Sequence, residues 1–156
     1  MSPIAQQLEL FRTSIPMRGF DHAAATRNRA ESLVSKITFD DGTTAWGETL
    51  PRDYVTGETF DSVVADVTDT LWPLCCEEGL LDGDATAEFP AMHDGRIITA
   101  AAALLETARA SRILAECPPQ KISARVSGIL GSADPAKTAK RLRLMWLGGL
   151  RDFKLK

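Results

Sequence analysis

The sequence predicts an α+β fold in which a three-stranded antiparallel sheet comes first, helices follow, and a strand–helix–strand unit comes last. Three observations lead to this prediction. Apolar residues alternate at period two on both sides of Asp41–Gly42. They recur at helical spacing between residues 59 and 116. Residues 122–156 then read as a β-rich run, a helix that starts with proline, and a second β-rich run.

The sheet is predicted from three segments. Leu8 to Ile15 has the character of an extended strand, and Pro16 to Phe20 is expected to break it and open a long connection that reaches about Arg29. In the next segment Leu33, Ile37 and Phe39 share one face at period two. Asp41–Gly42 then turns the chain back into a strand over residues 44–50, so a β-hairpin is expected here.

Two helices are predicted after Pro51. The first begins at the N-cap Thr59 and is expected to stop at Pro73. Its inward residues are Phe60, Val63, Val64, Val67 and Leu71. The second spans about Ile97 to Glu116 and ends before Pro118–Pro119. Its inward stripe contains Ile98, Ala101, Ala102, Leu105 and Ala108, and so many alanines favour close packing.

The last segment follows a different pattern. Ile122 to Leu130 is predicted to be a strand, Asp134–Pro135 supplies an N-cap followed by proline, and a helix then runs to Gly148–Gly149. One side of that helix is expected to carry Pro135, Ala139, Leu142 and Trp146. Residues 150–156 form the next strand, so the unit is predicted to be a right-handed βαβ unit with parallel strands.

Bulk composition limits the class of protein. With 156 residues, 44% hydrophobic and 25% charged, the chain is long enough to bury one core. No apolar run approaches the ~18 residues that span a bilayer, so we expect a cytoplasmic protein without a membrane partner. The three cysteines lack the spacing of a zinc site, and His22 and His93 alone do not make a histidine site, so no metal ligands are assigned in this chain.

The last 20 residues contain seven basic side chains and one acidic one, whereas the residues before Lys137 carry a formal charge of −9. A basic stretch of this kind can bind phosphates. Aromatic residues within it are limited to Trp146 and Phe153, so nucleic acid is not the expected partner.

The sequence ends on Lys154, Leu155 and Lys156. In a strand, alternate residues point to one face, so the two ammonium groups would be neighbours. With Cα atoms about 6.6 Å apart, they repel by about 2.5 kcal/mol at an effective dielectric of ~20. This repulsion favours loss of one proton and suits a general base. A solvated tail is the other interpretation of the same spacing.

Five segments occur together in one order: residues 41–51 (DGTTAWGETLP), 54–59 (YVTGET), 104–106 (LLE), 126–130 (VSGIL) and 154–156 (KLK). In this combination the chain resembles the N-terminal part of the enolase superfamily. The likeness is to the mandelate racemase and muconate lactonizing enzyme family, in the branch that holds muconate cycloisomerases, dipeptide epimerases and o-succinylbenzoate synthases.

The resemblance implies a capping domain over residues 1–120 and the start of a (β/α) barrel over 121–156. It implies that Lys156 is the base that removes a proton α to a carboxylate, and that Lys154 makes this easier and attracts the carboxylate. It also implies Mg²⁺ in the complete enzyme, because sites of this superfamily pair a lysine or histidine base with magnesium. The three acidic ligands and a second lysine would come from later barrel strands, so we expect no cofactor on this chain alone.

In the family, two loops of the capping domain close over the substrate, and here they correspond to residues 16–29 and 52–56. The candidate substrate-binding residues are therefore Met17, Arg18, Phe20, His22 and Tyr54. Glu48, within the Gly47–Glu48 pair, is interpreted instead as a cap or bridge at the edge of the sheet.

We therefore expect the front portion of a magnesium-dependent epimerase or cycloisomerase that acts on a small carboxylate of amino-acid, dipeptide or hydroxy-acid type. Its remaining barrel would lie on a separate chain or be lost to truncation, so the chain alone would be inactive. A complementary barrel chain or a homo-oligomer is the expected partner. The alternative is a non-catalytic module that associates through Leu142, Met145 and Trp146. A basic tail that binds nucleic acid is the third possibility.

Overall fold

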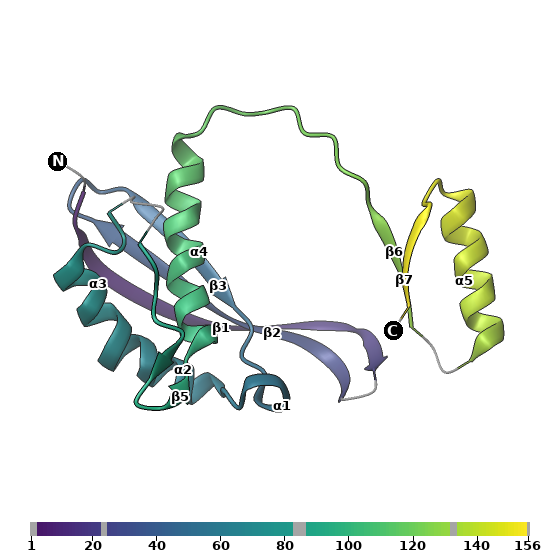
Figure 1. The fold of residues 1–156 in the computed structure, drawn as a ribbon, viewed down its shortest axis with the longest axis horizontal. Helices are drawn as coiled ribbons and strands as arrows, with labels where there is room; N and C mark the ends of the chain where they lie inside the picture. The colour runs from purple at the N-terminus through teal and green to yellow at the C-terminus, as the bar shows by residue number, and fades with distance from the viewer. Residues whose placement is uncertain (1–2, 23–24, 83–86, 132–133, 156) are drawn as a thin grey trace. The chain divides into compact units, whose positions relative to one another are not determined.

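The computed structural model describes residues 3–22, 25–82, 87–131 and 134–155; Figure 1 shows its course. Contacts divide the chain into two compact units, one made of residues 1–15 and 30–118 and the other of residues 16–29 and 119–156. The first unit contains helices packed on a three-stranded sheet, and the second contains a parallel strand pair with its helix. The predicted α+β class is confirmed.

The antiparallel sheet has the order β1-β2-β3. Its strands are β1 (Ala5–His22), β2 (Ala25–Phe39) and β3 (Thr44–Thr49). The predicted hairpin is confirmed, since Thr38 lies opposite Thr44 in the antiparallel register of β2 and β3. In its turn, the Thr43 hydroxyl and amide donate to the Asp41 carboxylate and lower the pKa of that group.

Pro16 does not break the first strand, which corrects the expected loop over residues 16–29. The strand continues to His22, and β2 already begins at Ala25. The physical reason lies in the strand order, because β1 is at the edge of the sheet. A proline lacks the N–H of a ladder hydrogen bond, and an edge strand tolerates that loss on its open side.

One hydrophobic core lies between the sheet and the helices of the first unit. From the sheet it takes Leu33, Ile37 and Phe39, as predicted, each at most 2% exposed. From the helices it takes Val63, Val67, Leu71, Ile98, Ala101, Ala102, Leu104, Leu105 and Ala108. The outer face of the sheet carries the stacked rings of Phe11 and Trp46, with centroids 6.4 Å apart.

The first predicted helix is longer than expected. After the short α1 (Asp53–Thr56), a continuous helical stretch consists of α2 (Phe60–Ala65), the π-helical η1 (Asp66–Leu71) and α3 (Trp72–Glu78). The Thr59 cap is confirmed, because its side chain accepts the Ser62 amide at 3.1 Å and the Ser62 hydroxyl accepts the Thr59 amide.

Pro73 was expected to stop this helix, and that prediction is wrong. The helix ends at Gly79, which adopts a left-handed φ of 66°. Proline clashes with the carbonyl four residues before it in a regular α-helix. Here a π-helical turn comes immediately before, in which the Trp72 amide donates to the Val67 carbonyl. The wider turn therefore accommodates the proline without ending the helix.

A small antiparallel pair, β4 (Met92–His93) and β5 (Arg96–Ile97), leads into α4 (Thr99–Glu116). The buried Glu58 carboxylate caps the start of α4, accepting the Ala100 amide at 2.7 Å and the Thr99 hydroxyl at 3.0 Å. Helix α4 lies along β3 (Figure 1). The predicted alanine-rich inward stripe is confirmed, with its members at most 5% exposed.

The parallel unit consists of β6 (Ser127–Leu130), α5 (Pro135–Leu147) and β7 (Asp152–Leu155). Parallel pairing is confirmed, as is the Asp134 cap, which accepts the Ala136 amide at 2.9 Å. The first strand is shorter than predicted. Ile122 and Val126 are 85% and 67% exposed, because a β-rich run without a neighbouring strand has nothing to pair with.

Across the described residues, none of the helices has the length and apolar character needed to cross a bilayer.

Candidate functional site

The two faces of the β6–β7 pair are chemically different. Gly128 faces α5, since a methyl group added there would lie 2.8 Å from the Met145 sulfur and 3.0 Å from the Phe153 ring. Leu130, two residues further along, is 3% exposed on the same face. Ile129 is 50% exposed and points to the opposite face. The pair is thus covered by α5 on one side and open on the other.

Lys154 belongs to the open face. It lies opposite Ile129 in the parallel register, next to Phe153, which pairs with Gly128 on the helix side. Side chains alternate along a strand, so Lys154 points away from α5, and it is exposed. Lys156 lies outside the described residues. Lys154 lies in the strand β7, and the pairing of the two lysines and their roles stay predictions.

A carboxylate accompanies Lys154 on β7. Asp152 precedes it by two residues and so shares its face, and its carboxylate accepts from Arg125 at 2.9–3.0 Å. This ion pair was not among the predicted site features. The alternation that places Lys154 and Lys156 on one face of the strand also places Asp152 on that face. The position of Asp152 could therefore have been predicted from the sequence. Arg125 has no such signal, because it lies in an irregular segment.

Helix α5 packs on the strands with a different side from the one predicted. Trp146 and Leu142 are 59% and 38% exposed, and Ala139 is also exposed. The half-buried residues are Thr138 and Met145. Glycine at position 128 explains the difference, because it leaves room for the Met145 side chain over the strand.

The candidate substrate-binding residues lie on elements other than those expected. Met17, Arg18, Phe20 and His22 are part of β1 rather than of a loop. Met17 is 39% exposed, while the side chains of the other three lie outside what the structure describes. Tyr54 is 43% exposed in the single turn of α1, where a loop was expected. Their role in binding stays a prediction.

Glu48 acts at the sheet edge through its backbone. Its amide donates to the Thr107 hydroxyl at 3.0 Å, and its carbonyl accepts from that hydroxyl at 3.2 Å. One turn further along α4, the Ser111 hydroxyl accepts the Trp46 amide at 2.9 Å. Two hydroxyl groups of α4 thus form hydrogen bonds with backbone groups on the outer edge of β3. The Glu48 side chain remains exposed.

The described residues contain no group of side chains arranged as a magnesium site. Within the described ranges, no three acidic, histidine or cysteine side chains come together in a way that could hold a metal ion. Asp152, the acidic residue beside Lys154, is already paired with Arg125.

No family model matches the chain. A curated relative does: the L-Ala-D/L-Glu epimerase of Bacillus subtilis (strain 168) is 31% identical over 80 residues, which cover 51% of this chain and 22% of that protein. The solved structure of that epimerase with bound substrate covers 100% of this chain and 45% of its own length, with a TM-score of 0.74 and 23% identity.

Two further structures carry the same fold. A dipeptide epimerase from Enterococcus faecalis, solved with Mg and the dipeptide L-Leu-L-Tyr, has a TM-score of 0.71 at 19% identity and covers 98% of this chain and 45% of its own. An enolase-superfamily member from Listeria innocua has a TM-score of 0.69 at 16% identity and covers 98% and 44%. The chain has the fold of the N-terminal part of enolase-superfamily structures.

The likeness is to the N-terminal part of superfamily members, as predicted. The chain spans less than half the length of the solved relatives, and the 80 residues aligned with the curated relative are about a fifth of that protein. The relatives named above include epimerases. The activity, substrate and partners of the whole protein are a separate question.

Proposed function

We propose that this chain supplies the capping domain, residues 1–120, and the first lysine-bearing strand, within residues 121–156, of a magnesium-dependent enolase-superfamily epimerase or cycloisomerase. The observation that carries the proposal is the position of Lys154. It lies on a strand that pairs in parallel with β6, on the face that α5 leaves open. In a (β/α) barrel the helices lie outside, so the face without a helix is the one that faces inward.

The reaction that suits two adjacent lysines is removal of a proton α to a carboxylate. Lys156, two residues beyond Lys154, would take that proton, and the ammonium group of Lys154 would attract the substrate carboxylate and favour the neutral form of its neighbour. Asp152 would stay paired with Arg125 at the start of the strand. Mg²⁺ would supply charge stabilisation in the complete enzyme, held by residues that this chain does not provide.

The substrate would be a small carboxylate of amino-acid, dipeptide or hydroxy-acid type. Two of the relatives support this class, since one is an L-Ala-D/L-Glu epimerase and another was solved with a dipeptide. Met17, Arg18, Phe20, His22 and Tyr54 remain the proposed specificity contacts. The partner would be the remaining barrel, on a complementary chain or in continuation of this one.

The test extends residues 1–156 with the C-terminal barrel part of the Bacillus subtilis epimerase. The fusion is incubated with Mg²⁺ and L-Ala-L-Glu in heavy water, and NMR follows loss of the α-proton signal. We expect exchange by the fusion and none by the 156-residue chain alone. Lys156→Ala should slow exchange by about 10²- to 10⁴-fold, Lys154→Ala should also slow it, and the exposed control Lys121→Ala should leave it unchanged.

Two results would count against the proposal. Exchange by the isolated chain would show that the chain is active without the barrel. Exchange by the fusion at an undiminished rate in the Lys156→Ala variant would remove the lysine from the reaction.

A non-catalytic module is the second candidate function. It is favoured by the exposed apolar side chains of α5, where Leu144, Trp146 and Leu147 are 60%, 59% and 83% exposed. A fusion that folds but never exchanges the α-proton would favour this reading.

A further inference from the structure

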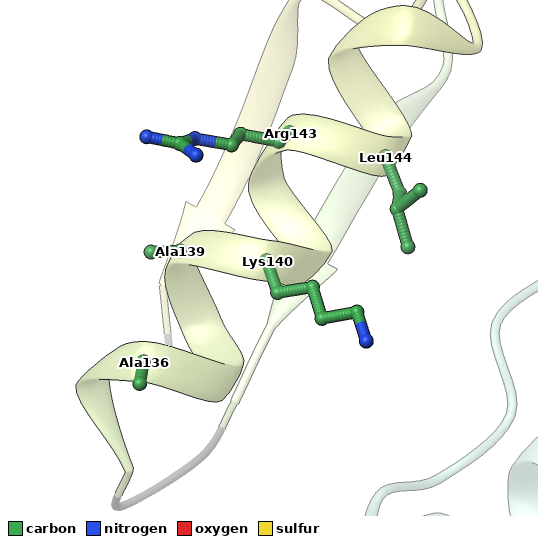
Figure 2. Close-up of a pocket in the computed structure, with 5 residues that line it drawn as sticks. All are labelled: Ala136, Ala139, Lys140, Arg143 and Leu144. Carbon is green, nitrogen blue, oxygen red and sulfur yellow. The ribbon is translucent and has the colours of Figure 1, made fainter.

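Helix α5 carries a basic face that its own unit does not cover. Between Pro135 and Leu147 it has four basic residues, Lys137, Lys140, Arg141 and Arg143, and no acidic one. A shallow groove of about 460 Å³ runs along the helix and is lined by Ala136, Ala139, Lys140, Arg143 and Leu144. Figure 2 shows the Lys140 and Arg143 side chains leaving the helix from neighbouring turns and extending in different directions.

This groove lies on the side of α5 turned away from its strands. Successive helical residues are about 100° apart, so Ala136, Lys140 and Arg143 share one side, while Thr138 and Met145 point the other way. The burial agrees, since the first three are exposed and the last two are half-buried. Small side chains let another helix approach closely, and the basic residues beside them favour an acidic one.

An acidic helical surface of this kind exists on the same chain. The helical stretch from Phe60 to Glu78 has five acidic residues, Asp61, Asp66, Asp69, Glu77 and Glu78, and no basic one. Asp66 is buried. The other four are exposed, together with the small residues Ala65 and Thr68. Its exposed side therefore has the same mixture of small and charged residues as α5, with the opposite sign.

We propose that α5 of one copy docks on the exposed acidic side of the helical stretch 60–78 of a second copy. Opposite charge selects the pairing, and the small residues on both helices let their backbones approach. Every copy has both surfaces, so a pair of copies offers this contact twice. A phosphate backbone explains the apolar members Ala136, Ala139 and Leu144 less well, since it gains nothing from burying them.

The experiment measures the dimer dissociation constant of the 156-residue chain by sedimentation equilibrium. Raising the ionic strength from about 50 mM to about 500 mM should weaken the dimer by about tenfold, because salt screens exposed charges. The basic-face variant Lys140→Glu/Arg143→Glu and the acidic-face variant Asp69→Lys/Glu77→Lys should each weaken it by at least tenfold. The matched control Arg29→Glu/Lys121→Glu makes the same change in net charge on exposed residues outside both helices and should have little effect.

The decisive measurement is made on a mixture of the basic-face and acidic-face variants. In the mixture the acidic α5 of one variant faces the basic helical stretch of the other, and the remaining contact keeps its native signs. A heterodimer as tight as the wild-type dimer is therefore expected, with circular dichroism showing that both variants are folded. A monomeric wild-type chain, a dimer indifferent to both variants, or a mixture that stays monomeric would each overturn the proposal.

Discussion

Gly47 is the residue at which the sheet and α4 come into closest contact. A methyl group added there would collide with the Leu104 carbonyl oxygen, and it would lie 2.7 Å from the Ser35 hydroxyl and 3.0 Å from the Ala108 amide nitrogen. The alanine-rich side of α4 and the glycine of β3 thus meet almost backbone to backbone. This contact places the strand that carries Glu48.

We expect Gly47→Ala to lower the free energy of unfolding by about 3 kcal/mol, because an extra carbon in a packed core forces the backbone apart. Urea denaturation measures the loss. Gly57→Ala is the control, since its methyl group would meet nothing within 4 Å and only its φ of 78° is unfavourable; its cost should be about 1 kcal/mol. Equal losses for both variants would contradict the close contact.

The cysteines differ in their surroundings. Cys75 is buried in the core, and burial raises the pKa of its thiol to about 12, with the nearby Cys76 adding to the rise. Cys117 is exposed at the end of α4. Because the thiolate is the reactive form, Cys75 should remain almost unreactive at any pH well below 12.

Iodoacetamide labelling of the native chain at pH 8, read by mass spectrometry, should modify Cys117 well before Cys75. In denaturant the two should react at similar rates. Fast labelling of Cys75 in the native chain would contradict its burial.

At the scale of elements, α4 protects the open edge of β3. Edge strands expose unpaired backbone groups and invite pairing with other chains. Here the Thr107 and Ser111 hydroxyls bond to backbone groups of Glu48 and Trp46. Two hydroxyl groups, one helical turn apart on α4, thus take the place of a fourth strand at this edge.

Thr107→Val keeps the shape of the side chain and removes its hydroxyl. We expect a loss of about 1 kcal/mol in the free energy of unfolding, since one hydrogen bond contributes about that much. Hydrogen exchange at the Glu48 amide should become faster, while exchange at the Trp46 amide, held by Ser111, should change less. An unchanged rate at Glu48 would show that the hydroxyl does not protect the edge.

Local signals made most elements predictable. The Asp41–Gly42 turn, the Thr59 and Asp134 caps and the inward stripe of α4 all depend on residues close in sequence, and all are confirmed. The breaks predicted at the two prolines were wrong, because the effect of a proline depends on its structural surroundings. Pro16 lies in an edge strand and Pro73 follows a π-helical turn, and neither condition can be read from residues nearby in sequence.

The candidate site was predictable in part for the same reason. Alternation along β7 placed Lys154, and the structure agrees for that residue. The side of α5 that packs depends on a glycine in another strand, Gly128, so Trp146 was assigned to the wrong face. Arg125 reaches Asp152 across 27 positions of sequence, and no local pattern could reveal such a contact.

Taken as a whole, the chain contains a three-stranded antiparallel sheet packed with helices and one parallel βαβ unit. The relatives that share this arrangement extend to more than twice the length. Parallel strands are normally covered on both faces, and here α5 covers one face of β6 and β7 while the other face is open. The proposed chemistry depends on that face carrying the lysines.

The face of β7 that carries the two lysines can be measured directly from the nuclear Overhauser contacts of the Lys154 and Lys156 side chains in the 156-residue chain. The account predicts contacts from Lys154 to the Ile129 methyl groups, none to the Met145 methyl group, and Lys156 on the same face as Lys154. Contacts from Lys154 to Met145, or the two lysines on opposite faces of β7, would contradict the lysine-bearing face and the proposed function with it.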